Sequence, residues 1–115
     1  MILRTAAVVC ALAFSASALA GPVGNAANGK KKAVAVCAAC HGADGNKTLD
    51  ASYPKLAGQY PEYLAKALHE YKSGKRKNAI MAGQAQGLSE KDIADLSAYF
   101  ASRSSEIHDL SGHAR

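Results

Sequence analysis

The sequence contains few cysteines. Its 115 residues include only Cys10, Cys37 and Cys40, and the last two form a C-x-x-C pair. A structural zinc site needs four protein ligands, usually with a second C-x-x-C or an H-x-x-x-H pair, and the only other thiol is Cys10. A thioredoxin-like redox pair would need a βαβ context, and no β-rich run precedes Cys37. These absences count against a structural zinc site and against a thioredoxin-like pair.

Aromatic residues are also scarce. Tryptophan is absent, and phenylalanine and tyrosine make up 6% of the chain. The formal net charge is +5, but no basic stripe is interleaved with aromatic residues as nucleic-acid binding would favour. The basic charge therefore indicates an acidic protein partner or an anionic surface rather than DNA or RNA.

Long apolar runs are missing except near the start of the chain. Residues 1–20 contain Arg4, then a small or apolar run, then Ala18-Leu19-Ala20, which is typical of a secretory signal. The run is short of the roughly 20 residues that a membrane span needs. Val8 and Val9 precede Cys10, where a lipoprotein would have a small residue. We therefore expect a signal peptide cleaved between residues 20 and 21 (or 18 and 19), a periplasmic domain over 21–103 and a flexible polar tail over 104–115.

The one cysteine pair is followed at once by a histidine. The run Cys37-Ala38-Ala39-Cys40-His41 has the C-x-x-C-H pattern of c-type haem attachment. Two thiols on one helical turn can each add to a vinyl group of the same porphyrin, and the next residue then stands beneath the iron. A disulfide would leave His41 without a role. The pattern predicts one haem c held by Cys37 and Cys40, with His41 as an iron ligand.

Three further positions are candidates around this haem. The carbonyl of Pro54 is placed to accept the proton of His41 Nδ1, although an ordinary turn proline is the alternative. Leu56 would cover the porphyrin with apolar surface. Met81 is the only methionine left after processing, in a glycine-bounded loop, and Met/His ligation is the pairing of cytochromes c. His69 is the competitor for the sixth ligand position.

Helical periodicity predicts an all-α domain. Apolar or small residues recur at three- and four-residue steps from Ala26 to Cys40, with Gly29 on the apolar face, where a close helix approach would justify it. A second helix is predicted from Pro61 to Ser73, and a third from Ser89 to near Arg103. The second should bury Tyr60, Leu64, Ala67, Leu68 and Tyr71; the third should bury Ile93, Leu96 and Phe100.

These residues resemble a small class I cytochrome c of the bacterial periplasmic kind, over nearly all of the domain. The resemblance rests on Cys37 to Gly42, Asp44-Gly45-Asn46, Pro54 to Gln59, Tyr63-Leu64, the Met81 loop, and Leu88 to Phe100. It implies three main helices around one haem, with the first and last crossing at Gly29 and Tyr99. It also implies a hydrogen bond from Asn78 to the Met81 sulfur. Three positions depart from the usual pattern. Ala33 replaces an aromatic residue, Ala79 replaces a loop proline, and Gln84 stands near the position where similar proteins often have a second methionine.

Both axial positions would then be filled, and no acid–base pair faces the iron. We expect a soluble one-electron carrier cycling between Fe(III) and Fe(II), not an enzyme, as a monomer or a small subunit. A basic group, Lys72, Lys75, Arg76 and Lys77, would steer it onto acidic redox partners. One alternative is a haem subunit of an enzyme complex, such as a flavocytochrome sulfide dehydrogenase. Another is a haem sensor or peroxidase in which Met81 does not bind the iron.

Overall fold

The structure is a computed structural model that describes residues 22–105, and this range contains helices and no strand. The all-α prediction is therefore confirmed for the described residues. The expected signal peptide and most of the expected tail lie outside them. None of the helices within residues 22–105 combines the length and apolar character needed to cross a membrane. The helices are α1 (Ala26–Val36), α2 (Ala38–His41), α3 (Pro61–Ser73), α4 (Ala79–Gln86) and α5 (Glu90–Ala101).

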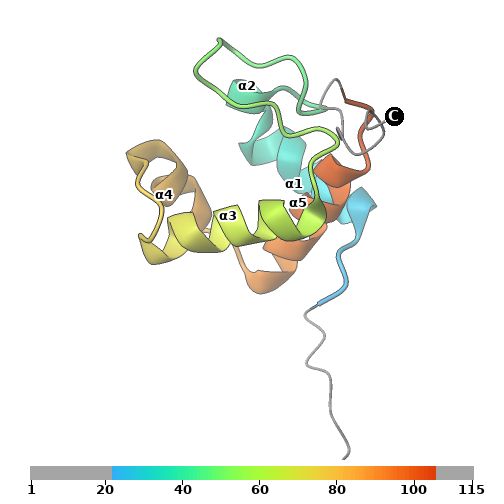
Figure 1. Cartoon of the computed structure of the whole chain (residues 1–115). Helices are drawn as coiled ribbons and strands as arrows, with labels where there is room; N and C mark the ends of the chain where they lie inside the picture. The colour runs from blue at the N-terminus through green and yellow to red at the C-terminus, as the bar shows by residue number, and fades with distance from the viewer. Residues whose placement is uncertain (1–21, 106–115) are drawn as a thin grey trace, which may run out of the picture.

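Helices α1 and α5 cross at close range (Figure 1). A Cβ atom added to Gly29 would lie 1.9 Å from the Asp95 carbonyl oxygen and 2.8 Å from Tyr99 Cβ. Both distances are shorter than van der Waals contact, so only glycine permits this approach. The predicted crossing through Gly29 and Tyr99 is confirmed.

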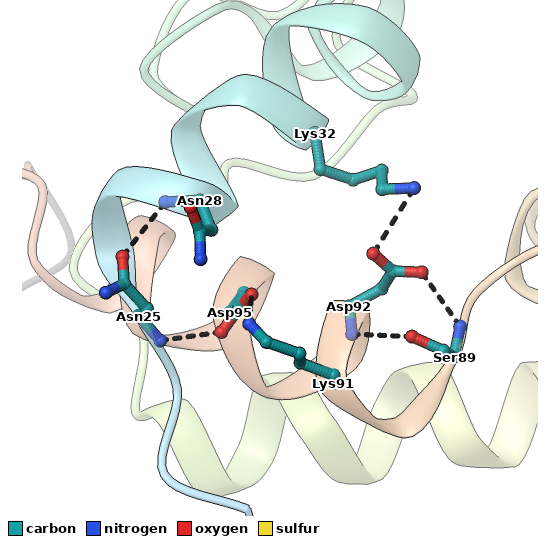
Figure 2. A network of polar contacts seen from close by, with 7 residues as sticks. All are labelled: Asn25, Asn28, Lys32, Ser89, Lys91, Asp92 and Asp95. Atoms are coloured by element: carbon teal, nitrogen blue, oxygen red, sulfur yellow. Dashed lines mark hydrogen bonds and ion pairs between the residues drawn. The ribbon is translucent and has the colours of Figure 1, made fainter.

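A polar network joins the start of α1 to the middle of α5 (Figure 2). The backbone amide of Asn25 donates to Asp95 Oδ1 at 2.7 Å, and Lys91 Nζ lies 2.5 Å from Asp95 Oδ2. The Lys91 ammonium, and then the Asn25 amide, hold the pKa of Asp95 below its usual value. Asp95 is thus a buried carboxylate with its charge compensated, which the sequence periodicity did not indicate.

Helix α5 begins at the predicted position, where Ser89 and Asp92 form a capping box. The Ser89 hydroxyl accepts from the Asp92 amide at 3.0 Å, and Asp92 Oδ2 accepts from the Ser89 amide at 2.9 Å. Lys32 Nζ of α1 lies 3.2 Å from Asp92 Oδ1. The Ser89 amide is the largest cause of a lowered Asp92 pKa. This capping box therefore also ties α5 to α1 (Figure 2).

Helix α3 begins and ends where the sequence predicts. Pro61 occupies its first turn, and Gly74 ends it with a φ of +77°. Leu64 is buried against α5, together with Ile93, Leu96 and Phe100. The prediction that Tyr60 is buried is wrong, because Tyr60 lies before the first helical turn in extended backbone and is 61% exposed. Ala67, Leu68 and Tyr71 are half-buried.

Two local predictions need correction. The first helix is not continuous to Cys40: α1 ends at Val36, and Cys37 (φ −106°) separates it from the short α2. Met81 does not lie in a loop, since it belongs to α4, a two-turn helix capped by Asn78. Gly83 within α4 and the lack of an amphipathic stripe conceal this helix in the sequence.

Candidate haem site

The two thiols of the motif lie at the junction of α1 and α2. The Cys37 amide donates to the Ala33 carbonyl at 2.8 Å, and the His41 amide donates to the Cys37 carbonyl at 3.0 Å. This turn places Cys37 and Cys40 as neighbours on one face, three residues apart. Both are half-buried and neither forms a disulfide. The spacing allows both sulfurs to bond to one planar group.

The Cys37 thiol does not have the properties of a redox cysteine. Burial, and secondarily the neighbouring Cys40, raise the pKa of Cys37 to about 11. Thioredoxin-like cysteines instead have lowered pKa values, because the thiolate is their nucleophile. The raised pKa is further ground against a thioredoxin-like pair.

His41 is buried, with 6% of its surface exposed. Its Nδ1 lies 2.9 Å from the Pro54 carbonyl oxygen, which is one of the two roles that the sequence left open for Pro54. A carbonyl can only accept, so Nδ1 carries the proton and Nε2 keeps a lone pair in the neutral ring. Such a bond fixes the tautomer and ring orientation of a metal-binding histidine.

The loop that carries Pro54 is held in place by α5. The Tyr99 hydroxyl donates to the Ala43 carbonyl at 2.7 Å, and the Gly58 amide donates to the Phe100 carbonyl at 2.9 Å. Between these ties, the Leu56 amide donates to the Gly45 carbonyl at 2.8 Å. Leu56 is half-buried and packs against the core. The long loop is therefore ordered by contacts distant in sequence.

Tyr53 is a residue of this site that the sequence analysis missed. Its ring lies edge-on to the His41 ring, with centroids 6.1 Å apart. The adjacent Cys40 thiol is the largest cause of a raised Tyr53 pKa. Its position directly before Pro54 was the only available signal.

Met81 lies in the first turn of α4 and is half-buried. It shares a helix face with Ala85, which is fully buried, while Ile80 and Gln84 are exposed. Met81 therefore faces the interior side of α4. Asn78 Oδ1 accepts from the Met81 amide at 2.9 Å, so this oxygen caps the helix and only the side-chain nitrogen can donate to the sulfur.

The competing ligand candidate, His69, is engaged elsewhere. Its Nε2 lies 3.4 Å from Glu90 Oε2, at the start of α5, and 46% of its side chain is exposed. This pairing directs His69 toward the surface between α3 and α5. The geometry gives no support to His69 as an iron ligand.

The predicted basic group is largely occupied by its own fold. Lys72 Nζ donates to the Leu88 carbonyl. Arg76 Nε and Lys75 Nζ lie 3.5 and 3.8 Å from the Glu70 carboxylate. These contacts leave Lys77 as the one member that makes no ion pair or hydrogen bond with another described residue.

The donor atoms fit a group that brings its own metal ligands. Within residues 22–105, no cluster of three or more histidine, cysteine or acidic residues could hold a bare metal ion. The site instead offers one oriented imidazole and two thiols a helical turn apart. A porphyrin supplies nitrogen ligands around its iron, so it needs only covalent anchors and axial ligands from the protein. The chain's residues fit haem c.

Comparisons with known proteins identify the family of the chain. The cytochrome c family profile matches residues 26–104. The chain is 48% identical to cytochrome c4 of Pseudomonas aeruginosa over 96 residues, which is 84% of this chain and 47% of that protein. It is 46% identical to cytochrome c-554(548) of Halomonas halodenitrificans over 83 residues, which is 70% of this chain and 98% of that protein. The chain thus spans about half the length of its cytochrome c4 relatives and nearly all of the second protein.

A more distant relative is the cytochrome subunit of sulfide dehydrogenase from Chlorobaculum tepidum, 36% identical over 63% of this chain and 64% of that protein. Among solved structures, reduced cytochrome c4 from Pseudomonas stutzeri matches with a TM-score of 0.67 and 40% identity, over 74% of this chain and 48% of that one. Together with the haem-binding motif and the oriented histidine, these matches show that the chain belongs to the cytochrome c family and has the class I cytochrome c fold.

Proposed function

We propose that this protein carries one electron at a time on a single haem c, bound through Cys37 and Cys40, with His41 and Met81 as axial ligands. The observation that carries the proposal is the 2.9 Å hydrogen bond from His41 Nδ1 to the Pro54 carbonyl oxygen. It leaves Nε2 as the free donor atom of a buried histidine that directly follows the two thiols. This arrangement suits a fixed axial ligand.

When bound, the haem supplies the Fe(III)/Fe(II) couple, and the chain's residues set its surroundings. Cys37 and Cys40 would hold the ring as thioethers, and Pro54 keeps the His41 imidazole in one orientation. Leu56 provides apolar cover, and the side-chain nitrogen of Asn78 can donate to the Met81 sulfur. Thioether ligation favours ferrous iron and raises the potential.

With His41 and Met81 both holding the iron, no position would remain there for a substrate. This suits outer-sphere electron transfer rather than enzymatic conversion of a substrate. The pattern of residues 1–20 supports export to the periplasm, where haem c proteins can receive their cofactor. A cleaved signal also removes Cys10, which leaves both remaining thiols for the haem.

Mass spectrometry of protein purified from an exporting host tests attachment and haem number together. The expected mass is that of the chain without its signal plus one haem, retained after denaturation. Variants Cys37→Ala and Cys40→Ala should each hold the haem through the one remaining thioether, so its mass should still persist after denaturation. A mass without haem, or with two haems, would contradict the proposal.

Docking to an acidic redox partner is the second part of the proposal. Since Lys72, Lys75 and Arg76 have partners in their own fold, we expect Lys77 and the exposed Lys75 to contribute most of the steering. Association rates should fall as ionic strength rises, and Lys77→Met should flatten that dependence. A rate independent of ionic strength would exclude electrostatic steering.

A permanent place in an enzyme complex is the alternative function. It is favoured by the likeness to the cytochrome subunit of sulfide dehydrogenase. Gel filtration of native extract separates the two functions, because a free carrier elutes at the mass of this chain alone. Co-elution of the haem absorbance with a larger flavin-containing subunit would favour the alternative.

A further inference from the structure

Helix α4, which carries Met81, is too short to be stable by itself. It has 8 residues, whereas isolated helices shorter than about 12 to 15 residues are marginal in water. Ala79 at its start lacks the fixed backbone angle that a proline would give. Contacts with the rest of the fold must therefore determine where α4 lies.

The C-terminal end of α4 is tied to α3 by a reciprocal pair of hydrogen bonds. Gln86 Nε2 donates to the Lys72 carbonyl at 2.7 Å, and Lys72 Nζ donates to the Leu88 carbonyl. The Lys72 carbonyl is one of the last four of α3, which have no partner within the helix. Gln86 thus supplies a partner that the end of α3 lacks, and Lys72 holds the Leu88 carbonyl just after α4.

The segment that leads into α4 is also fixed on α3. The Arg76 amide donates to the Glu70 carbonyl at 3.0 Å, just after Gly74 ends the helix. The Arg76 guanidinium donates to the Tyr63 hydroxyl at 3.3 Å and lies 5.4 Å from the Tyr71 ring centroid. Figure 1 shows the result, with α4 folded back beside the C-terminal end of α3.

We infer that Lys72, Arg76 and Gln86 form a clamp, here called the α3–α4 clamp, that positions Met81 for the iron. The inference rests on the proposed role of Met81 as axial ligand. Met81 and Ala85 share the interior face of α4, so rotation or unwinding of this helix would carry the Met81 sulfur away. Lys72 is thereby assigned to ligand positioning rather than to docking.

The clamp can be tested on the full-length ferric holoprotein with two matched pairs of variants. Lys72→Met removes the ammonium but keeps the chain length, and Lys77→Met makes the same charge change in the same region without a clamp contact. Gln86→Ala removes the second hydrogen bond, and Gln84→Ala alters an exposed glutamine of the same helix. The readouts are affinity for added imidazole, which competes with Met81, and the weak far-red absorption band of iron–sulfur bonding.

Loss of a hydrogen bond from a charged donor should weaken Met81 ligation and tighten imidazole binding by about tenfold in Lys72→Met. Lys77→Met and Gln84→Ala should bind imidazole like the wild type. Gln86→Ala should tighten imidazole binding in the same direction as Lys72→Met. It is the deciding variant if Lys72→Met does not fold.

Three results would overturn the inference, and they separate it from the proposed function. A wild-type spectrum without the far-red band contradicts Met81 ligation itself, and the clamp with it. A wild-type band with equal imidazole affinity in Lys72→Met and Lys77→Met contradicts the clamp alone. A lowered free energy of unfolding in Lys72→Met with unchanged imidazole affinity would mean that Lys72 only stabilises the fold.

Discussion

Replacing Gly29 by alanine tests the crossing of α1 and α5. The position of the loop that carries Pro54 depends on this crossing, because α5 holds that loop. The added Cβ would lie 1.9 Å from the Asp95 carbonyl oxygen, a backbone atom that cannot move without moving α5. The helices would have to separate by more than an ångström, since a carbon–oxygen contact needs roughly 3.4 Å. Separation would weaken the hydrogen bond from Asn25 to Asp95 and the packing of Tyr99.

The expected change is a net loss of stability. Alanine gains about 1 kcal/mol over glycine in a helix interior. Overpacking of a well-packed core costs about 1 to 3 kcal/mol, and more where backbone must move. We therefore expect Gly29→Ala to lower the free energy of unfolding by about 2 kcal/mol.

Gly83→Ala is the matched control, because a Cβ there meets no atom within 4 Å. The same substitution should stabilise α4 by up to about 1 kcal/mol. Denaturant titration of the ferric holoprotein, followed by far-ultraviolet circular dichroism, measures both variants. If the free energy of unfolding of Gly29→Ala equals that of the wild type, or rises as in Gly83→Ala, then α1 and α5 do not cross this closely at Gly29.

Three further predictions follow from single contacts. Ser89→Ala removes the acceptor for the Asp92 amide and should lower the free energy of unfolding by about 1 kcal/mol in the same titration, with no loss if the capping box contributes nothing. Because the folded-state pKa of Asp95 is lowered, its stabilisation is present above the unfolded value of about 3.9 and is lost as pH falls through the folded value. Asp95→Asn should therefore reduce stability at neutral pH and flatten its acid dependence, and an unchanged pH profile would refute this role. Met81→Ala should lose the far-red band and bind carbon monoxide in the ferrous state, whereas a retained band would place another ligand on the iron.

The sequence was most informative where local signals act alone. Pro61 and Gly74 delimit α3, and Ser89 with Asp92 marks the start of α5, because caps and fixed backbone angles act within a few residues. The spacing of the C-x-x-C-H motif predicts Cys37 and Cys40 as the haem anchors from local sequence in the same way. The contact of His41 with the Pro54 carbonyl was one of two alternatives that the sequence left open, the other being an ordinary turn proline.

Contacts made across long sequence separations were not predictable. The buried Asp95 carboxylate has a partner in the backbone amide of Asn25, 70 residues away, and the periodic apolar positions gave no sign of its burial. Helix α4 went unrecognised because tertiary contacts, not its own pattern, stabilise it. The sequence predicted that the basic residues before α4 form a docking surface for partners, whereas Lys72 and Arg76 form hydrogen bonds within the fold.

Potentiometric titration of the purified holoprotein, followed by its visible spectrum, tests one-electron transfer on a single haem most directly. We predict one reversible wave in which the Fe(III)/Fe(II) ratio changes tenfold for about every 59 mV of applied potential. The midpoint potential should be positive, and the ferrous protein should not bind carbon monoxide. Two resolved waves, or a ferrous form that binds carbon monoxide readily, would contradict a single haem with both His41 and Met81 on the iron.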